Sequence, residues 1–287
     1  MQDLLSAPAA AIHLELRHTG DPAALLRRLA ALQLPDHAVL GLGAPWITAA
    51  GGEVDGHRAM PALRGASAAA PSTQADLWLW VRADEPGVAW QRARALLGEL
   101  GPELELVDEL ALFRFDGGRD LTGYEDGTEN PTGDDALAAA VVADGPLAGS
   151  SFAAVQRWTH RLDVMAAMPP RDQDLTIGRE RVSNEEIDDA PDSAHVKRAA
   201  QEDYDPPAFM LRRSMPWGGV QRHGLLFLAF GADLDRFERV LRRMLGLDDG
   251  VTDNLFRFST PETGAYYWCP AVDSGRLRLD AAGLRPG

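Results

Sequence analysis

The chain has 287 residues, of which 45% are hydrophobic, and its formal net charge at pH 7 is −15. This length and composition are sufficient for one large or two modest globular domains with a hydrophobic core. An acidic surface repels the phosphates of nucleic acids and anionic membranes, so we expect neither nucleic acid nor membrane as a partner.

The cysteine content is minimal, since Cys269 is the single cysteine of the sequence. One cysteine excludes an intrachain disulfide, an iron–sulfur cluster and a cysteine-based zinc site. The N-terminal residues lack a basic start followed by a long apolar run, so we expect no secretory signal. No stretch approaches the ~20 apolar residues that span a membrane. We therefore predict a cytoplasmic protein.

The first half of the chain alternates predicted strands and helices. The first helix follows Gly20, with Asp21 placed as N-cap and Pro22 at the first helical position. The other predicted elements are strands at His13–Arg17, Asp76–Arg82 and Leu110–Phe115 and a helix at Pro86–Leu100. Strand–helix–strand units with short connections are typical of an α+β ferredoxin-like domain.

The second half repeats this alternation. Its predicted elements are strands at Ser151–Trp158, Ala208–Ser214, Leu225–Phe230 and Gly264–Pro270 and an amphipathic helix at Asp233–Gly246. The strand at Leu225–Phe230 is apolar on both faces, which indicates a central position in its sheet. We predict two α+β domains, residues 1–145 with the acidic loop described next and residues 146–287.

The loop "GYEDGTENP", Gly123–Pro131, crowds acidic residues between glycines. Its composition is typical of a solvated turn. A calcium-binding EF-hand loop counted from Asp126 would need glycine at the sixth position and glutamate at the twelfth, where the chain has Pro131 and Leu137. This mismatch rejects the calcium interpretation. A catalytic carboxylate on a glycine-hinged turn is the remaining alternative, and it needs partners elsewhere in the chain.

Histidine spacing gives no metal motif. The sequence has no HExxH and no histidine pair at i and i+4 on a helix, so a two-histidine zinc site is unsupported. A single axial histidine on haem needs no such spacing, because the porphyrin supplies four ligands. The candidates are His13, His18, His37, His57, His160, His195 and His223.

A series of motifs then resembles one family. In order they are "GYEDG", "DGTENP", "QRW", "IGR", "SAHVKR", "LRRSMPWG" and "DNLFRFSTPETGAYYWCP". From about residue 110 onward, the chain resembles the dye-decolourising-type haem peroxidases, and its short length and "RRSMPWG" resemble the bacterial B-type subgroup. The resemblance implies an α+β fold of two ferredoxin-like domains with antiparallel sheets, similar to the dimeric α/β-barrel superfamily. It also implies haem b, held mainly by the C-terminal domain.

The resemblance assigns site residues one by one. His195 in "SAHVKR" matches the proximal haem ligand, and Asp253 matches the aspartate that hydrogen-bonds it. Arg198 resembles a haem-propionate contact. Asp126 matches the distal aspartate and Arg212 the distal arginine, which together would be catalytic, and Arg212 would also contact the cofactor.

Each implied role has a physical reason. A carboxylate on the second ring nitrogen gives His195 imidazolate character. On the distal side a carboxylate can move the proton of peroxide, and a fixed cation stabilises the charge on the departing oxygen. We also expect the positive charge of Arg212 to keep Asp126 ionised. Alternation along the predicted strand places Arg212 on the face of Met210 and Ser214.

Plain structural roles remain open for the same residues. Arg212 could form a salt bridge, Asp253 could be an N-cap and Asp126 could be a turn residue. Ser214 stands where some relatives carry asparagine, so an amide role is absent there.

The resemblance implies an enzyme, a haem peroxidase that reduces hydrogen peroxide and oxidises dyes, phenols or porphyrinogens through a ferryl intermediate. The alternatives are a porphyrin-handling protein, a haem-binding protein with little turnover, and a haem-free ferredoxin-like binding module. We expect hydrogen peroxide and a small-molecule reductant as partners, and a homo-oligomer. Relatives enter encapsulin shells through a C-terminal peptide, but "RLRLDAAGLRPG" is not clearly such a peptide. The sequence leaves the reductant and the oligomeric state open.

Overall fold

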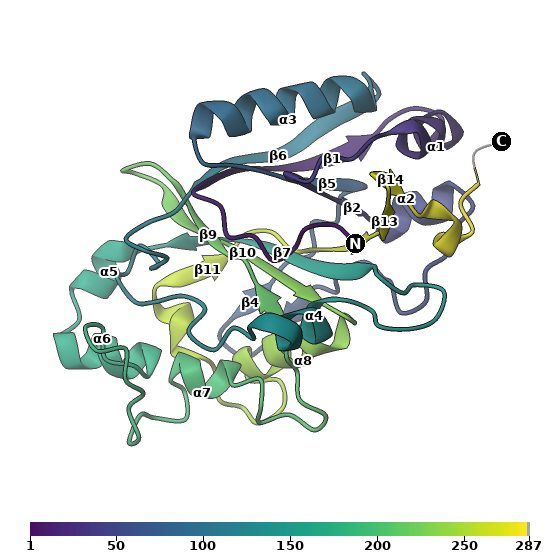
Figure 1. The fold of residues 1–287 in the computed structure, drawn as a ribbon. Coiled ribbons are helices and arrows are strands. Elements are labelled where there is room, and N and C mark those ends of the chain that lie inside the picture. The colour runs from purple at the N-terminus through teal and green to yellow at the C-terminus, as the bar shows by residue number, and fades with distance from the viewer. Residues whose placement is uncertain (286–287) are drawn as a thin grey trace.

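The structure of the protein is a computed structural model that describes residues 1–285. The end of the C-terminal segment considered above as a targeting peptide lies outside these residues. Figure 1 shows a central antiparallel sheet with helices on both sides. This arrangement confirms the predicted α+β class with antiparallel sheets.

The main sheet has ten strands in the order β11-β7-β12-β2-β5-β1-β6-β9-β10-β8, and an additional pairing of β7 with β10 closes it into a barrel. The strands are β1 Ala10–His18, β2 Ala38–Leu42, β5 Leu77–Ala83, β6 Leu104–Phe113, β7 Ser151–His160, β8 Leu211–Arg212, β9 Met215–Gly218, β10 His223–Gly231, β11 Ser259–Pro261 and β12 Ala265–Cys269. Two small hairpins pair β3 Leu63–Arg64 with β4 Ala69–Ala70 and β13 Val272–Asp273 with β14 Arg276–Leu277.

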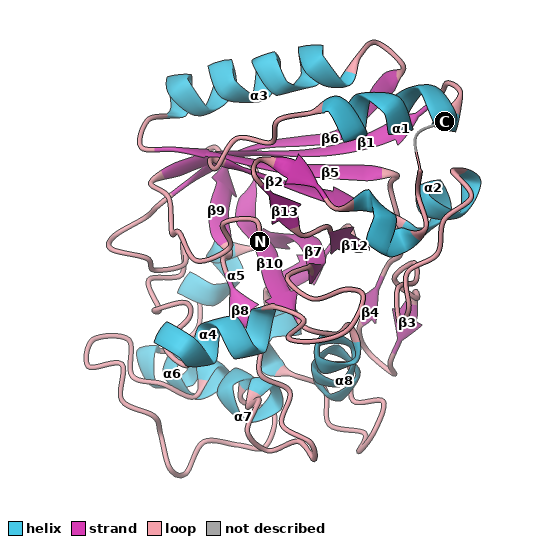
Figure 2. Ribbon diagram, turned by 45° about the vertical axis from the view of Figure 1, so that its right-hand side comes forward, coloured by secondary structure: helices cyan, strands magenta, loops and turns pink. Residues whose placement is uncertain are grey.

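The helices form two layers. Figure 2 shows α1 and α3 on one side of the sheet and α4, α6, α7 and α8 on the other. Their bounds are α1 Pro22–Ala31, α2 Ala44–Ala49, α3 Pro86–Leu100, α4 Gly133–Ala140, α5 Leu162–Ala166, α6 Pro170–Ile177, α7 His195–Ala199 and α8 Asp235–Met244, with short 3-10 helices at Asn254–Arg257 and Leu279–Ala282. Across residues 1–285, no helix combines the length and the apolar character that a membrane span requires.

Local signals determine several boundaries. The Asp21 side chain accepts a hydrogen bond from the backbone N–H of Ala23 at 3.0 Å, which confirms the predicted N-cap. Helix α3 has the predicted bounds and ends at Gly101, whose φ of 95° favours glycine. The predicted strand at Leu225–Phe230 forms part of β10, between β7 and β9, and its central position is confirmed.

The predicted strand at Ala208–Ser214 is present but shorter than predicted. Only Leu211 and Arg212 pair with β10 as a strand. On the edge of β8 that faces away from β10, the Asn130 side chain accepts from the Arg212 N–H at 2.8 Å and donates to the Arg212 carbonyl at 3.1 Å. Pro206 and Pro207 lack an N–H for a ladder.

The two halves of the chain meet within the barrel. Trp268 of β12 pairs with Leu42 of β2, and Leu112 of β6 pairs with Trp217 of β9. The domain boundary between residues 145 and 146 stays a prediction.

The barrel interior is aromatic and contains a polar cluster. The Tyr267 hydroxyl donates to a carboxylate oxygen of Glu15 at 2.9 Å, and Trp78 donates to His13 Nδ1 at the same distance. Burial raises the pKa of Glu15 to about 7.

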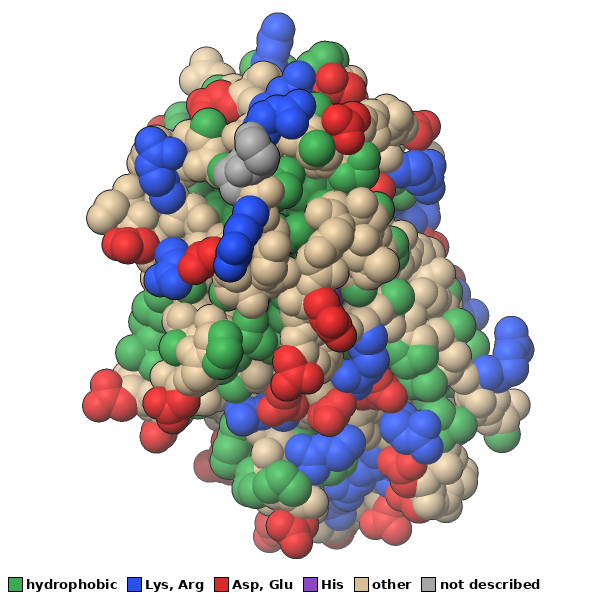
Figure 3. Space-filling view, turned by 90° about the vertical axis from the view of Figure 1, so that its right-hand side faces the viewer, with side chains coloured by type: hydrophobic (Ala, Val, Ile, Leu, Met, Phe, Trp, Pro, Cys, Tyr) green, Lys and Arg blue, Asp and Glu red, His purple; other side chains and the backbone are tan. Residues whose placement is uncertain are grey.

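Charges of both signs share the molecular surface. Figure 3 shows basic and acidic side chains interspersed on one face. Surface pairs such as Arg278 with Asp280, at 3.0 Å, illustrate the mixing. Since exposed pairs contribute only about 0–1 kcal/mol each, they mainly balance charge rather than stabilise the fold.

Candidate active site

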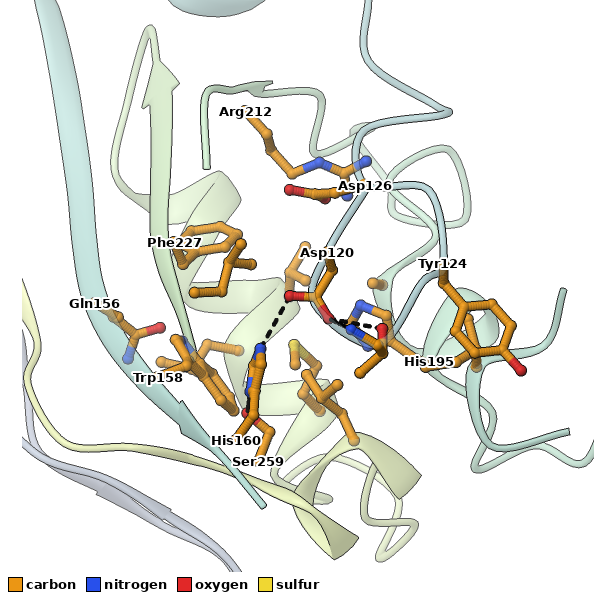
Figure 4. Close-up of a pocket in the computed structure, with 18 of the residues that line it drawn as sticks. Asp120, Tyr124, Asp126, Gln156, Trp158, His160, His195, Arg212, Phe227 and Ser259 are labelled. Atoms are coloured by element: carbon orange, nitrogen blue, oxygen red, sulfur yellow. Dashed lines mark hydrogen bonds and ion pairs between the residues drawn. The ribbon is translucent and has the colours of Figure 1, made fainter. Parts of the chain in front are cut away.

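A largely apolar cavity lies between the barrel wall and the helix layer that contains α7 and α8. Strand β10 contributes Leu225 and Phe227, and α8 contributes Phe237, Val240 and Leu241. Figure 4 shows the polar groups around it, with Asp126 and Arg212 at one end and His160 and Ser259 at the other. An apolar cavity with a few convergent polar groups is the usual form of a cofactor or substrate site.

His195 begins helix α7 and faces this cavity. Its side chain is 29% exposed, and its Nδ1 lies 2.8 Å from Oδ2 of the buried Asp253. Because a carboxylate only accepts, Nδ1 carries the proton and Nε2 keeps its lone pair for a ligand. Burial opposes protonation of the imidazole, but the carboxylate of Asp253 raises the pKa of His195 above its ordinary value.

Asp253 has two functions at once. Its Oδ1 accepts from the backbone N–H of Leu255 at 2.7 Å and caps the short helix Asn254–Arg257, while Oδ2 holds His195. The N-cap alternative is therefore also correct. The cap fixes the carboxylate, and the carboxylate orients the imidazole.

The acidic loop positions Asp126 at the cavity. Asn130 fastens the loop to the backbone of Arg212, and Gly127 has a φ of 81°. A Cβ at Gly127 would lie 2.6 Å from the Asn130 side-chain nitrogen, so glycine is required for both reasons. The plain-turn interpretation of this loop is thus incomplete, since the turn presents Asp126 to the cavity.

Arg212 lowers the pKa of Asp126, as expected, but it does not set the net shift. Burial raises the pKa of Asp126, and the nearby Asp120 carboxylate raises it further, which outweighs the lowering by Arg212. The sequence does not predict the burial of Asp126, because the residues of its loop are polar.

Arg212 and Met210 both line the cavity, as the alternation predicted, whereas Ser214 lies outside its described lining. Arg213 turns the other way and donates to the carbonyl of Leu5 at 2.7 Å. Within residues 1–285, the Arg212 guanidinium makes no salt bridge, and its buried Nε lacks a hydrogen-bond partner. The salt-bridge alternative for Arg212 is therefore unsupported, and its donors remain available to a ligand.

Arg198 has partners within the protein. Its buried guanidinium forms two 2.7 Å hydrogen bonds with Asp249 and a third with the Arg243 carbonyl at 2.6 Å. These contacts face the end of α8, and Arg198 lies outside the described lining of the cavity. Arg198 therefore anchors α7, which begins with His195, and the haem-propionate contact implied for it stays a prediction.

Sequence reasoning missed the opposite end of the cavity. His160 Nε2 lies 3.0 Å from Asp120 Oδ2, and His160 Nδ1 lies 2.7 Å from Ser259 Oγ. Burial works against ionisation of Asp120, but hydrogen bonds from His160 and Thr122 lower its pKa overall. The sequence offers one signal for these two residues, which is their proximity to the family motifs: Asp120 precedes "GYEDG" and His160 follows "QRW" by a few positions.

Comparisons with known proteins identify the family. The family model described as "Dyp-type peroxidase, C-terminal" matches residues 117–274, more than half of the chain. The chain belongs to the Dyp-type peroxidase family. A dye-decolorizing peroxidase of Brevibacterium linens is 33% identical over 218 residues, which cover 73% of this chain and 59% of that protein. The chain thus aligns with less than two thirds of this curated relative.

Solved structures of the Dyp-type family match nearly the whole chain. The dye-decolorizing protein from V. cholerae has 30% identity and a TM-score of 0.85, covering 93% of this chain and 95% of the other. A DypB variant from Rhodococcus jostii RHA1 in complex with heme has 29% identity and a TM-score of 0.87, covering 94% and 96%. The matched length includes both halves of the barrel.

Proposed function

We propose that this protein is a haem b peroxidase that reduces hydrogen peroxide and oxidises a small organic reductant. The observation that carries the proposal is His195, held by the buried Asp253, in the same cavity as Asp126 and Arg212. Its relative from Rhodococcus jostii was solved with heme, and family membership supports the same cofactor here.

The residues present fit a haem. Nδ1 of His195 is occupied by Asp253, so Nε2 would be the ligating atom, and apolar side chains of β10 and α8 line the same cavity. The guanidinium of Arg212, which lines this cavity too, would supply a positive charge to a bound ligand. Bound haem would supply the iron and the redox chemistry that the protein side chains lack.

The distal residues divide the acid–base work. Asp126 accepts a proton from one peroxide oxygen and returns it to the other. Its raised pKa makes the acceptance and the return of the proton more equal in free energy. Arg212 keeps its charge throughout and stabilises negative charge on the departing oxygen. Asp253 holds the Nδ1 proton of His195 on the proximal side.

Rapid mixing with hydrogen peroxide tests this function. The haem-loaded protein should lose its ferric spectrum on mixing, and an added phenol should restore it. The matched control is a variant that combines Asp126→Ala with Arg212→Leu and should react far more slowly. An unchanged spectrum in the unmodified protein would instead identify a haem-binding protein with little turnover.

Other expectations stay predictions. They are the cytoplasmic location, the homo-oligomer, the encapsulin shell as a partner, and the choice among dyes, phenols and porphyrinogens.

A further inference from the structure

A second cavity of about 210 Å³ adjoins the first, and Asp126, Arg212 and Leu225 line both. We call it the arginine vestibule. Its defining residues are Arg114, Phe115, Arg119, Asp126, Arg212, Arg213, Pro216 and Leu225. Arg114 and Phe115 lie on its exposed side, and Asp126 and Arg212 separate it from the main cavity.

Positive charge dominates the arginine vestibule. Arg119 is compensated by Glu125 at 2.9 Å and by Asp116 at 3.6 Å. Among the described residues, the guanidinium groups of Arg114, Arg212 and Arg213 have no carboxylate oxygen within 4.0 Å. Within residues 1–285, Arg114 donates to the carbonyl of Gly117 and Arg213 to those of Leu5 and Arg212. Such bonds do not neutralise the positive charge, which the more distant Asp3 offsets only in part at Arg213.

Two of these arginines carry unused donors. The Nε atoms of Arg212 and Arg213 are buried, and each lacks a hydrogen-bond partner in the described part of the chain. Because these two Nε atoms are buried, an anion in the cavity would instead contact the terminal nitrogens of the guanidinium groups and offset their charge. Burial lowers the pKa of Arg213, although the more distant carboxylate of Asp3 opposes that shift.

The size and the remaining lining restrict the ligand. A cavity of ~150 Å³ accommodates benzene, so about 210 Å³ admits one substituted ring. Phe115 is 38% exposed, and its ring is available for aromatic contact. Pro216 and Leu225 add apolar surface.

We propose that the arginine vestibule binds a monocyclic aromatic carboxylate, with its carboxylate on Arg114 and Arg213 and its ring against Phe115. The inference rests on the proposed peroxidase function in one respect, since it names the class of the organic reductant. The net charge of −15 disfavours anions at long range, but screening limits that repulsion to about 8 Å in physiological salt. Within that distance the arginines decide the affinity.

Calorimetric titration of the haem-loaded protein with 4-hydroxybenzoate, without peroxide, tests this site. We expect binding that weakens as salt rises and leaves the Soret band in place. Arg114→Gln should weaken the affinity about tenfold, since it removes a charged hydrogen-bond donor. Arg278→Gln, at an exposed arginine paired with Asp280, is the matched control and should bind as the unmodified protein does. Tyramine, a cation with the same phenol ring, should not bind.

Three results would overturn the proposal: an unchanged affinity in Arg114→Gln, tyramine binding as tightly as 4-hydroxybenzoate, or a Soret shift that places the carboxylate on the iron. Arg213→Gln is a second variant with the same expected loss, and its folding is checked by circular dichroism because Arg213 also holds Leu5. The titration contains no peroxide. A protein that binds 4-hydroxybenzoate as expected but shows no peroxidase turnover would therefore contradict the proposed function and not the proposed ligand of the vestibule.

Discussion

Replacing Asp253 with asparagine should weaken haem binding without disturbing the fold. The carboxylate accepts from His195 Nδ1 at 2.8 Å and from the Leu255 N–H at 2.7 Å. Asparagine has one acceptor oxygen and one NH₂ group. If the oxygen stays on Leu255, the NH₂ faces Nδ1, and the imidazole proton must move to Nε2. That proton occupies the lone pair needed for iron.

The expected magnitude follows from this conflict. Loss of a partner that orients a metal-bound histidine commonly costs about 10–100-fold in metal affinity or activity. That range corresponds to about 1.4–2.8 kcal/mol of binding free energy. Since the substitution conserves volume and the cap on Leu255, we expect the free energy of unfolding to change less than haem affinity does.

The assay is a titration of haem into the haem-free protein, followed by Soret absorbance. Asp248→Asn is the matched control, because Asp248 lies on the preceding turn in an exposed pair with Arg242 at 3.3 Å. The iron–histidine stretching frequency of the ferrous form should also fall in Asp253→Asn. Wild-type affinity together with an unchanged frequency would refute the reasoning and show that another group orients His195.

Three further predictions concern catalysis and stability. Arg212→Leu should slow the reaction with hydrogen peroxide more than Asp126→Ala does in stopped-flow measurements at several pH values, and the reverse order would make the carboxylate the main contributor. Burial raises the pKa of Glu15 from 4.5 to about 7, so the folded protein holds a proton that the unfolded chain releases. The free energy of unfolding should therefore fall as pH rises from 4.5 to about 7, and urea denaturation should show a smaller fall in Glu15→Gln. Asp21→Ala should lower the free energy of unfolding by about 1 kcal/mol through loss of the cap on Ala23, and an unchanged urea midpoint would contradict this.

The predictable parts of the fold are those with local signals. Helix α3 and the cap at Asp21 follow from capping, proline position and apolar spacing, and the structure confirms them. Strand β10 was recognisable from its continuous apolar run. The closure of the barrel through β7 and β10 depends on pairing between distant segments, which the periodicity of one strand does not encode.

Contacts between distant residues in the site were likewise not predictable from local sequence patterns. His195 and Asp253 are 58 residues apart, so their contact came from the family resemblance and not from spacing. The resemblance implies a haem-propionate contact for Arg198, and the structure adds that its side chain is hydrogen-bonded to Asp249. Direction and burial depend on tertiary packing, which local sequence does not specify.

The pair of Asp120 and His160 went unnoticed for a related reason. The two residues are 40 positions apart, and neither belongs to a spacing pattern with a known mechanism. The contacts of the Asn130 side chain with the backbone N–H and carbonyl of Arg212 were equally invisible. Such contacts need the three-dimensional structure.

The central claim is that His195 binds haem iron in this cavity, and the absorption spectrum of the purified protein with haem tests it most directly. The unmodified protein should bind haem and show a ferric Soret band characteristic of histidine ligation. His195→Ala should lose most of the bound haem or that spectrum. Unchanged haem content and an unchanged spectrum in His195→Ala would contradict the account.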